Sequence, residues 1–284
     1  MNPSVSLGLD MHQKSFQIAS LAGLVLSVCP TVALADDAPG TSITGNVAIT
    51  TDYMFRGLTQ TWGRPAIQGG GDLALKNGFA AGFWASDITH KSYPGGAMEL
   101  DLYASYGNSF DKDWSWRVGL YGYVYPGGGL DKARPALPSR SFNTLEANAA
   151  LTWKWLTLKY NRSLGDYFAI DTEQGYDGNS HGTQYIQLDA SIPINDKWSV
   201  ALHAARTLVS TELVAPLPSG TRNPDYNDFG ATLKFQFATH WSASFGATDT
   251  DNHSFYGHTA SFLDPTDTRD VGGLRGFAML QTTF

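Results

Sequence analysis

Apolar and polar residues alternate along the segment EANAALTWKWLTLKYN, which covers residues 146–161. The apolar positions are Ala147, Ala149, Leu151 and Trp153, followed after a change of phase at Lys154 by Leu156, Leu158 and Tyr160. Such alternation places the apolar side chains on one face of an extended chain and the polar side chains on the other. The segment therefore predicts two β-strands joined by a turn of two or three residues, with a tryptophan on each side of the turn.

The same period of two recurs along the chain from Ile43 onward. It predicts twelve strands, at residues 43–55, 66–75, 79–85, 98–106, 114–124, 146–153, 156–161, 186–192, 198–204, 228–237, 241–247 and 274–284. Asn77-Gly78, between the second and third of these strands, is a strong hairpin signal. The pattern therefore predicts an all-β chain.

The connections between these strands alternate between short and long. Short connections are expected near residues 76–78, 107–113, 153–155, 193–197 and 238–240, and long ones near 56–64, 89–97, 126–142, 165–182, 209–226 and 250–272. Outer-membrane barrels have short periplasmic turns and long extracellular loops, and a closed barrel leaves no unpaired strand edge in lipid. We therefore predict a single antiparallel transmembrane β-barrel of about twelve strands, with its apolar face toward lipid and its polar face toward the lumen.

Most of the tryptophans lie beside the short turns, at Trp114, Trp116, Trp153, Trp155, Trp198 and Trp241. An indole has a large apolar body and one N–H, which suits the boundary between hydrocarbon and lipid headgroups. In a barrel these side chains form a girdle at one end. In a soluble protein they would cap one end of the core instead.

Composition and the N-terminus narrow the class of protein. The mean hydropathy of -0.21 is too polar for a bundle of membrane helices, and the net charge of -7 argues against a nucleic-acid partner. Residues 1–35 are predicted to be a signal peptide cleaved after Ala35, with translation starting at Met1 or Met11; an uncleaved anchoring helix is the alternative. Residues 36–284 would then form an exported barrel, without the single cysteine, in the outer membrane of a Gram-negative bacterium.

The segments TDYMFRGLTQTWGRPAIQGGGDL, GFAAGFWASDI, ELDLYASYG and VGLYGYVYPGG, within residues 45–127, resemble the TorF family of porins. The most specific part is the spacing from FRG through RPAIQGG to FWAS. The resemblance implies an outer-membrane β-barrel that acts as a passive channel, without specifying a solute. The terminal Phe284 is similar to the aromatic end by which barrel-assembly machinery recognises such chains, although Thr282 is less apolar than that pattern prefers.

If the polar faces line a water-filled pore, their side chains set the electrostatic bias for passing solutes. The predicted pore-lining residues are Asp52, Arg56, Asp72, Glu99, Asp101, Arg117, Tyr121, Tyr123, Glu146, Lys159, Asp189, Lys234 and Arg275. The alternative is that the charges pair across strands and fill a narrow lumen. Likewise Tyr121, Tyr123 and Tyr125 either form a stacking track for sugars and other flat solutes or pack as ordinary lumen residues.

Two loops are candidates for the pore mouth. Arg56 and Arg64, where the first predicted strand ends, either brace the first loop or border the pore mouth. The long loop at residues 126–142 carries Lys132, Arg134 and Arg140, and it either folds inward as a constriction or is displayed in solvent.

The predicted function is passive diffusion of small hydrophilic solutes or ions across the outer membrane, with lipid as the surrounding partner and no cofactor or metal. The first alternative is a plugged barrel that acts as a structural or adhesive surface protein. The second is a lipid-acting enzyme with His240 and Ser242 as base and nucleophile, but that pair lies at a predicted periplasmic turn. We therefore expect no enzymatic activity.

Overall fold

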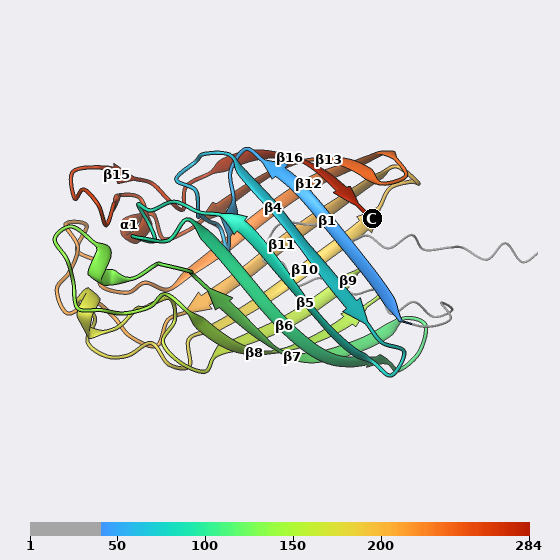
Figure 1. Ribbon diagram of the computed structural model, residues 1–284, viewed down its shortest axis with the longest axis horizontal. Helices are drawn as coiled ribbons and strands as arrows, with labels where there is room; N and C mark the ends of the chain where they lie inside the picture. Colours follow the sequence, from blue (N-terminus) through green and yellow to red (C-terminus); the bar gives the residue numbers. More distant parts are fainter. Residues whose placement is uncertain (1–40) are drawn as a thin grey trace, which may run out of the picture.

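The computed structural model describes residues 41–284, and the predicted signal peptide at residues 1–35 lies outside this range. Twelve strands hydrogen-bond in the order β1-β16-β13-β12-β11-β10-β9-β8-β7-β6-β5-β4 and close into an antiparallel barrel (Figure 1). Their bounds are β1 Ser42–Thr50, β4 Ala66–Ala74, β5 Phe79–Asp87, β6 Met98–Ser109, β7 Trp114–Val124, β8 Thr144–Trp153, β9 Leu156–Ser163, β10 Gln184–Pro193, β11 Trp198–Leu208, β12 Tyr226–Ala238, β13 Trp241–Thr250 and β16 Arg275–Thr283. The predicted all-β barrel is confirmed.

Figure 1 shows the long loops gathered at one end of the barrel and the short turns at the other, near the C-terminus. The long loops carry four two-residue strands and three short helices: β2 (Met54–Phe55), β3 (Leu58–Thr59), β14 (Thr259–Ala260), β15 (Thr268–Arg269), η1 (Leu130–Lys132), η2 (Thr172–Gln174) and α1 (His253–Tyr256). Within the described residues, no helix has the length and apolar character needed to cross a membrane.

The alternation along each strand separates an apolar outer wall from a polar interior. Ile67 is 60% exposed and Phe83 is 51% exposed on the outside, whereas Gln68 and Ser86 on the intervening positions are buried inside. An outer wall of this kind is matched to lipid tails, and closure pairs the backbone groups that an open sheet edge would leave unsatisfied. Trp114, Trp153, Trp155 and Trp241 are all partly exposed beside the short turns.

The barrel closes where β1 pairs with β16. The N–H of Gly45 donates to the carbonyl of Phe284 at 2.8 Å, and the N–H of Phe284 donates back to the carbonyl of Gly45 at 2.9 Å. A Cβ atom at Gly45 would lie 2.5 Å from the ring of Phe284. The glycine thus leaves room for the terminal aromatic ring beside the closing seam.

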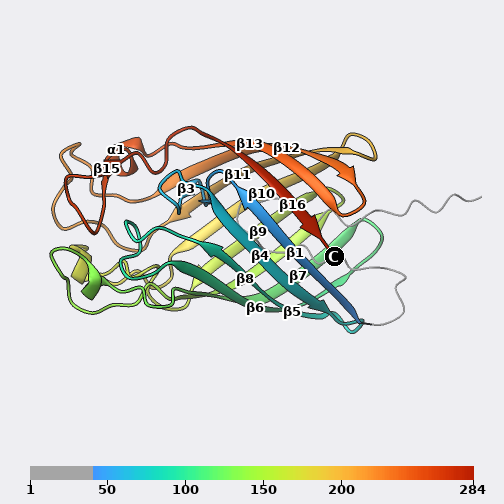
Figure 2. The same cartoon turned by 45° about the horizontal axis from the view of Figure 1, so that its top comes forward.

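The predicted C-terminal end of the first strand is wrong. β1 stops at Thr50 rather than continuing to Phe55, and residues 51–65, which we call the inserted loop, turn into the barrel. Within this loop β2 and β3 pair as a small hairpin whose two turn residues, Arg56 and Gly57, have φ angles of 49° and 76°. Figure 2 shows β3 at the end of the barrel that carries the long loops.

Candidate functional site: the lumen and the inserted loop

The predicted pore-lining residues lie inside the barrel. The strand residues among them are on the face opposite to the exposed apolar side chains, and Asp52 and Arg56 belong to the inserted loop. Glu99, Asp101, Tyr121, Tyr123, Glu146, Lys159 and Lys234 are buried, whereas Asp72, Arg117, Asp189 and Arg275 are only partly buried. The fold therefore brings charges of both signs into the interior. That these residues line a conducting pore stays a prediction.

The inserted loop fills part of this interior. Its residues 52–57 and 59–62 are all buried, with Met54 only 1% exposed. The tip of the hairpin lies against β12 and β13, because a Cβ atom at Gly57 would lie 2.7 Å from Cβ of Asp228 and 2.6 Å from Cγ2 of Thr250. β13 and β12 are only two and three places from β1 in the barrel order. The tip also reaches the more distant β8 and β10, because Arg56 contacts Glu146 and Tyr185, so the hairpin spans the lumen.

Asp52 organises the base of the inserted loop. One carboxylate oxygen accepts hydrogen bonds from the hydroxyls of Thr59 at 2.5 Å and Thr61 at 2.8 Å. Arg275 on β16 lies 3.7 Å from the other oxygen. The N–H of Thr59 also donates to the carbonyl of Val271 at 2.9 Å. These contacts tie both arms of the hairpin to the barrel.

Arg56 at the hairpin tip makes the main charged contact. Its Nη1 and Nη2 donate to the two oxygens of Glu146 at 3.0 and 2.7 Å, and both side chains are only 1% exposed. Nη1 also donates to the hydroxyl of Tyr167 at 3.0 Å. The guanidinium carbon lies 4.2 Å from the ring centroid of Tyr185. A planar guanidinium can form a bidentate ion pair and stack on an aromatic ring at the same time. Through these contacts with the barrel wall, Arg56 braces the loop.

Burial acts on the ionisable groups of the inserted loop in different ways. For Arg56, desolvation lowers the pKa, but Glu146 and the neighbouring tyrosines raise it by more, so the pKa of Arg56 lies above its ordinary value. For Tyr53, burial and then the charge of Glu99 raise the pKa well above its ordinary value. The guanidinium is therefore charged and the phenol is neutral inside the barrel.

Aromatic side chains surround the inserted loop. The Tyr53 ring lies 5.2 Å from that of Trp84, and the Phe55 ring lies 5.4 Å from that of Tyr123. Tyr121 and Tyr125 belong to the same buried cluster. The three tyrosines are thus packed in this cluster, with Tyr123 the most exposed at 5%, and a stacking role toward solutes stays a prediction.

The tyrosines on the wall of the barrel also donate hydrogen bonds to carboxylates. The hydroxyl of Tyr121 donates to Asp101 at 3.0 Å, and that of Tyr103 donates to Asp72 at 2.8 Å. Tyr103 crosses β5 to reach β4, and this needs Gly82, where a Cβ atom would lie 2.6 Å from the ring. Tyr103 and Asp72 are only partly buried and lie nearer the short turns than the inserted loop does. This part of the lumen is more accessible than the part around the loop.

The structure also assembles a cluster that the sequence did not indicate. His203 on β11 contacts carboxylates through both ring nitrogens, with Nδ1 2.5 Å from Asp189 and Nε2 2.9 Å from Asp228. The hydroxyl of Tyr185 lies 3.0 Å from Nε2 and 3.1 Å from the same Asp228 oxygen. We call Tyr185, Asp189, His203 and Asp228 the histidine cluster. Asp189 was among the predicted pore residues, whereas His203, Asp228 and Tyr185 were not.

The loop at residues 126–142 does not place its charges in the lumen. Lys132, Arg134 and Arg140 are exposed, and Arg140 bonds Asp171 of another long loop at 2.6 Å. The apolar Leu130 packs on the buried aromatic cluster instead. The element that enters the barrel is therefore the first loop.

Neither the enzyme alternative nor a metal site gains support from the arrangement. His240 lies in the turn between β12 and β13 and is exposed, whereas Ser242 is buried inside the barrel two residues later. Successive residues of a strand point to opposite faces, so Trp241 lies on the outer wall and Ser242 points into the barrel. Among the described residues, no contact joins His240 to Ser242. Across residues 41–284, no group of three or more His, Cys, Asp or Glu side chains is placed to hold a metal ion.

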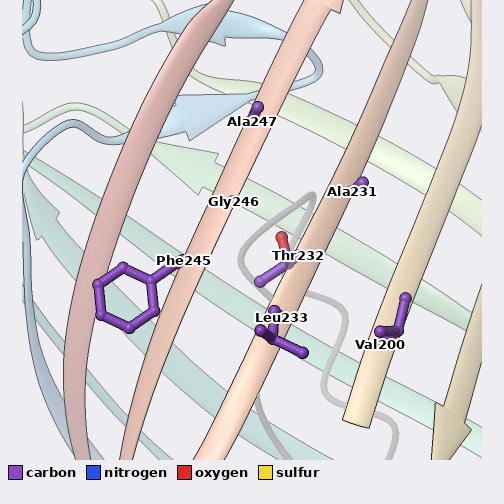
Figure 3. Close-up of a pocket in the computed structure, with 7 residues that line it drawn as sticks. All are labelled: Val200, Ala231, Thr232, Leu233, Phe245, Gly246 and Ala247. Atoms are coloured by element: carbon purple, nitrogen blue, oxygen red, sulfur yellow. The ribbon is translucent and has the colours of Figure 1, made fainter.

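A depression on the outer wall is separate from this interior. It lies over β11, β12 and β13 and is lined by Val200, Ala231, Thr232, Leu233, Phe245, Gly246 and Ala247 (Figure 3). Ala231 and Ala247 are paired in register, two residues along the strands from the exposed pair Leu233 and Phe245, so the small side chains leave a shallow space beside the larger ones. The depression therefore faces the lipid side of the barrel and is no part of the lumen.

Comparison with solved structures defines the class of fold. The chain is similar to the NanC porin, with a TM-score of 0.50 and 11% identity, over 85% of this chain and 98% of that chain. It is also similar to the KdgM porin in complex with disordered oligogalacturonate, with a TM-score of 0.49 and 8% identity over 86% of this chain and 99% of that chain. The COG4313 outer membrane channel from Pseudomonas putida F1 gives a TM-score of 0.48 and 11% identity, over 87% and 96% of the two chains. The fold is that of a porin-like transmembrane β-barrel.

The family follows from the sequence itself. A family described as "Bacterial protein of unknown function (Gcw_chp)" matches residues 34–272, and the chain therefore belongs to the Gcw_chp family. The match includes the inserted loop and every barrel strand except β16. A search of curated proteins finds no match. The narrower resemblance to the TorF porins stays a prediction.

Proposed function

We propose that the protein is an outer-membrane channel for passive diffusion of small hydrophilic solutes or ions, in which the inserted loop forms the constriction. The observation that carries this proposal is the closed barrel with ionisable side chains of both signs inside and an apolar wall outside. Charged residues in a barrel interior interact with passing ions when water reaches them. The TorF-like segments and the predicted signal peptide support the same proposal, including a location in the outer membrane of a Gram-negative bacterium.

The inserted loop limits the size of solute that such a channel accepts. The hairpin spans the lumen, and Arg56 at its tip contacts Glu146 on β8 and Tyr185 on β10. A solute must therefore pass beside the hairpin or wait until the loop moves. We expect ions and small sugars to pass and larger polymers to be excluded.

Planar-bilayer recording tests the proposal. Purified barrel should give discrete conductance steps, and a variant in which residues 54–59 are replaced by a short Gly-Ser linker should give larger ones. Reversal potentials in asymmetric salt then report the ion preference. If both proteins are folded and neither conducts, the channel function is wrong.

The second candidate function is that of a plugged barrel that displays its long loops as a structural or adhesive surface. The burial of the inserted loop and of Arg56 favours it. The same recordings separate the two candidates, because a plugged barrel stays silent until the hairpin is removed, whereas a constricted channel conducts with the hairpin present.

A further inference from the structure

The histidine cluster lies directly against the tip of the inserted hairpin. The guanidinium of Arg56 lies over the ring of Tyr185 at 4.2 Å. A Cβ atom on the next residue, Gly57, would lie 2.7 Å from Cβ of Asp228. Two consecutive residues at the tip therefore contact two members of the cluster, and any rearrangement of the cluster reaches the hairpin.

The geometry of His203 fits the imidazolium when both neighbouring carboxyl groups are ionised. Both ring nitrogens are within hydrogen-bonding distance of a carboxylate oxygen, at 2.5 Å from Asp189 and 2.9 Å from Asp228. A carboxylate only accepts hydrogen bonds, and a neutral imidazole has one N–H, so both contacts are hydrogen bonds only in the imidazolium. The side chains of His203 and Asp228 have no exposed surface, so the positive charge is held between two carboxylates.

Other charged groups around His203 come from the neighbouring elements. Tyr185 and Asp189 face it from β10, and Asp228 faces it from β12. Arg56 of the inserted loop lies over Tyr185, and Lys159 on β9 is paired in register with Gln187, between Tyr185 and Asp189. The inward-facing residues of its own strand, which include Ser199, Ala201, Ala205 and Thr207, carry no charge.

Loss of one proton from His203 leaves the cluster with too few donors. The remaining N–H stays with Asp189, the closer carboxylate, and the lone pair of Nε2 then faces Asp228 at 2.9 Å. The single hydroxyl proton of Tyr185, which lies 3.0 Å from Nε2 and 3.1 Å from Asp228, satisfies only one of these two atoms. A fully buried Asp228 with a lost donor is unfavourable, so the cluster rearranges or admits water.

We propose that the inserted loop is a gate and that His203 is the proton-binding residue that keeps it in the lumen. At neutral pH the imidazolium holds Tyr185 and Asp228 in place against Arg56 and Gly57. As the pH rises, His203 becomes neutral, this wall loosens and the loop leaves the lumen. The term gate rests on the proposed channel function, whereas the pH-dependent displacement of the loop does not.

Thiol labelling measures the displacement without any need for conduction. Met54 is buried in the hairpin at 1% exposure and contributes no side-chain hydrogen bond, so Met54→Cys, made together with Cys29→Ser, reports loop release. A Ser219→Cys variant, at an exposed position, corrects for the intrinsic pH dependence of thiol reactivity with a polar methanethiosulfonate reagent. We expect the corrected labelling rate to rise about tenfold between about pH 6 and about pH 10.

Three further substitutions assign the effect to the cluster. His203→Gln should make the corrected rate independent of pH. Tyr185→Phe keeps the ring under Arg56 but removes the one donor left to Nε2 and Asp228 once His203 is neutral, so it should increase the pH dependence of the corrected rate. His240→Gln, at an exposed turn outside the cluster, should retain the full pH dependence. A flat rate in the parent, or an unchanged pH dependence in His203→Gln, would overturn the proposal.

Recordings on the same proteins separate this inference from the proposed function. Labelling that depends on pH in a barrel that never conducts supports loop displacement and removes the channel. Conductance that persists while labelling stays flat supports the channel and removes the role of His203.

Discussion

Replacing Arg56 with alanine should release the inserted loop. The change leaves Glu146 at 1% exposure without the guanidinium that contacts both of its oxygens. Breaking a buried ion pair by removing one partner costs about 3–5 kcal/mol, because the other charge stays desolvated. The loop can avoid this cost by leaving the lumen, since water then reaches Glu146. The substitution therefore destabilises the loop inside the lumen relative to the released loop. The ratio of released to inserted loop should rise by roughly two to three and a half orders of magnitude.

The barrel itself should be much less affected than the loop. Its stability rests on backbone pairing between twelve strands, and Arg56 belongs to none of them. Thiol labelling of Met54→Cys with and without Arg56→Ala measures loop release, and unfolding in urea measures the stability of the barrel. We expect labelling to approach the rate of an exposed thiol, with a small change in the urea midpoint.

A double substitution checks the electrostatic reasoning. Arg56→Met together with Glu146→Gln removes both charges, so no ion is left buried and the loop should return largely to the lumen. Arg56→Lys keeps the charge but cannot contact both oxygens in the same plane, and it should give an intermediate result. If Arg56→Ala labels as slowly as the parent, the pair does not hold the loop and the argument fails.

Three further predictions follow from other parts of the barrel. Asp52→Ala removes the acceptor of two threonine hydroxyls in the inserted loop, so thiol labelling of Met54→Cys should rise, by less than in Arg56→Ala. Gly45→Val should place a methyl group against the ring of Phe284 and slow closure of the barrel. The gel mobility of unheated samples measures the rate of barrel folding, and an unchanged rate would contradict this prediction. Asp72→Asn removes a partly buried carboxylate from the accessible part of the lumen, so reversal potentials in asymmetric salt should shift toward anions, and an unaltered reversal potential would exclude Asp72 from the ion path.

The strands could be predicted from the sequence because lipid and lumen impose opposite demands on alternate residues. This signal is local, and it gave the twelve strands and the alternation of short and long connections. It failed at residues 51–55, because Tyr53 and Phe55 continue the apolar period of β1. Alternation shows that a side chain avoids water, but it does not distinguish lipid from an aromatic cluster inside the barrel.

The histidine cluster could not be predicted because it depends on strand register. In β11, His203 lies between Leu202 and Ala204, and the pattern marks it only as an inward polar residue. Its contacts with Asp189 and Asp228 depend on how β10 and β12 pair with β11. On β10, Asp189 lies directly opposite His203. On β12, the residue opposite His203 is Gly230, which is two residues from Asp228. Asp189 lies across a short turn from His203, but β11 and β12 are joined by a long loop, so the register that brings Asp228 to His203 leaves no local signal in a single sequence.

The separation along the chain between Arg56 and its partners sets the order of assembly. Glu146 and Tyr167 are 90 and 111 residues away from Arg56, on elements that lie next to the hairpin only after the barrel has closed. The hairpin itself has strands of two residues, which are too short to be stable alone in water. We therefore expect the loop to enter a barrel that has already formed, because its contacts are made mostly by side chains rather than by the backbone pairing of the wall. Because the wall does not depend on the hairpin, we expect the loop to leave and return without unfolding the barrel, as the proposed gate requires.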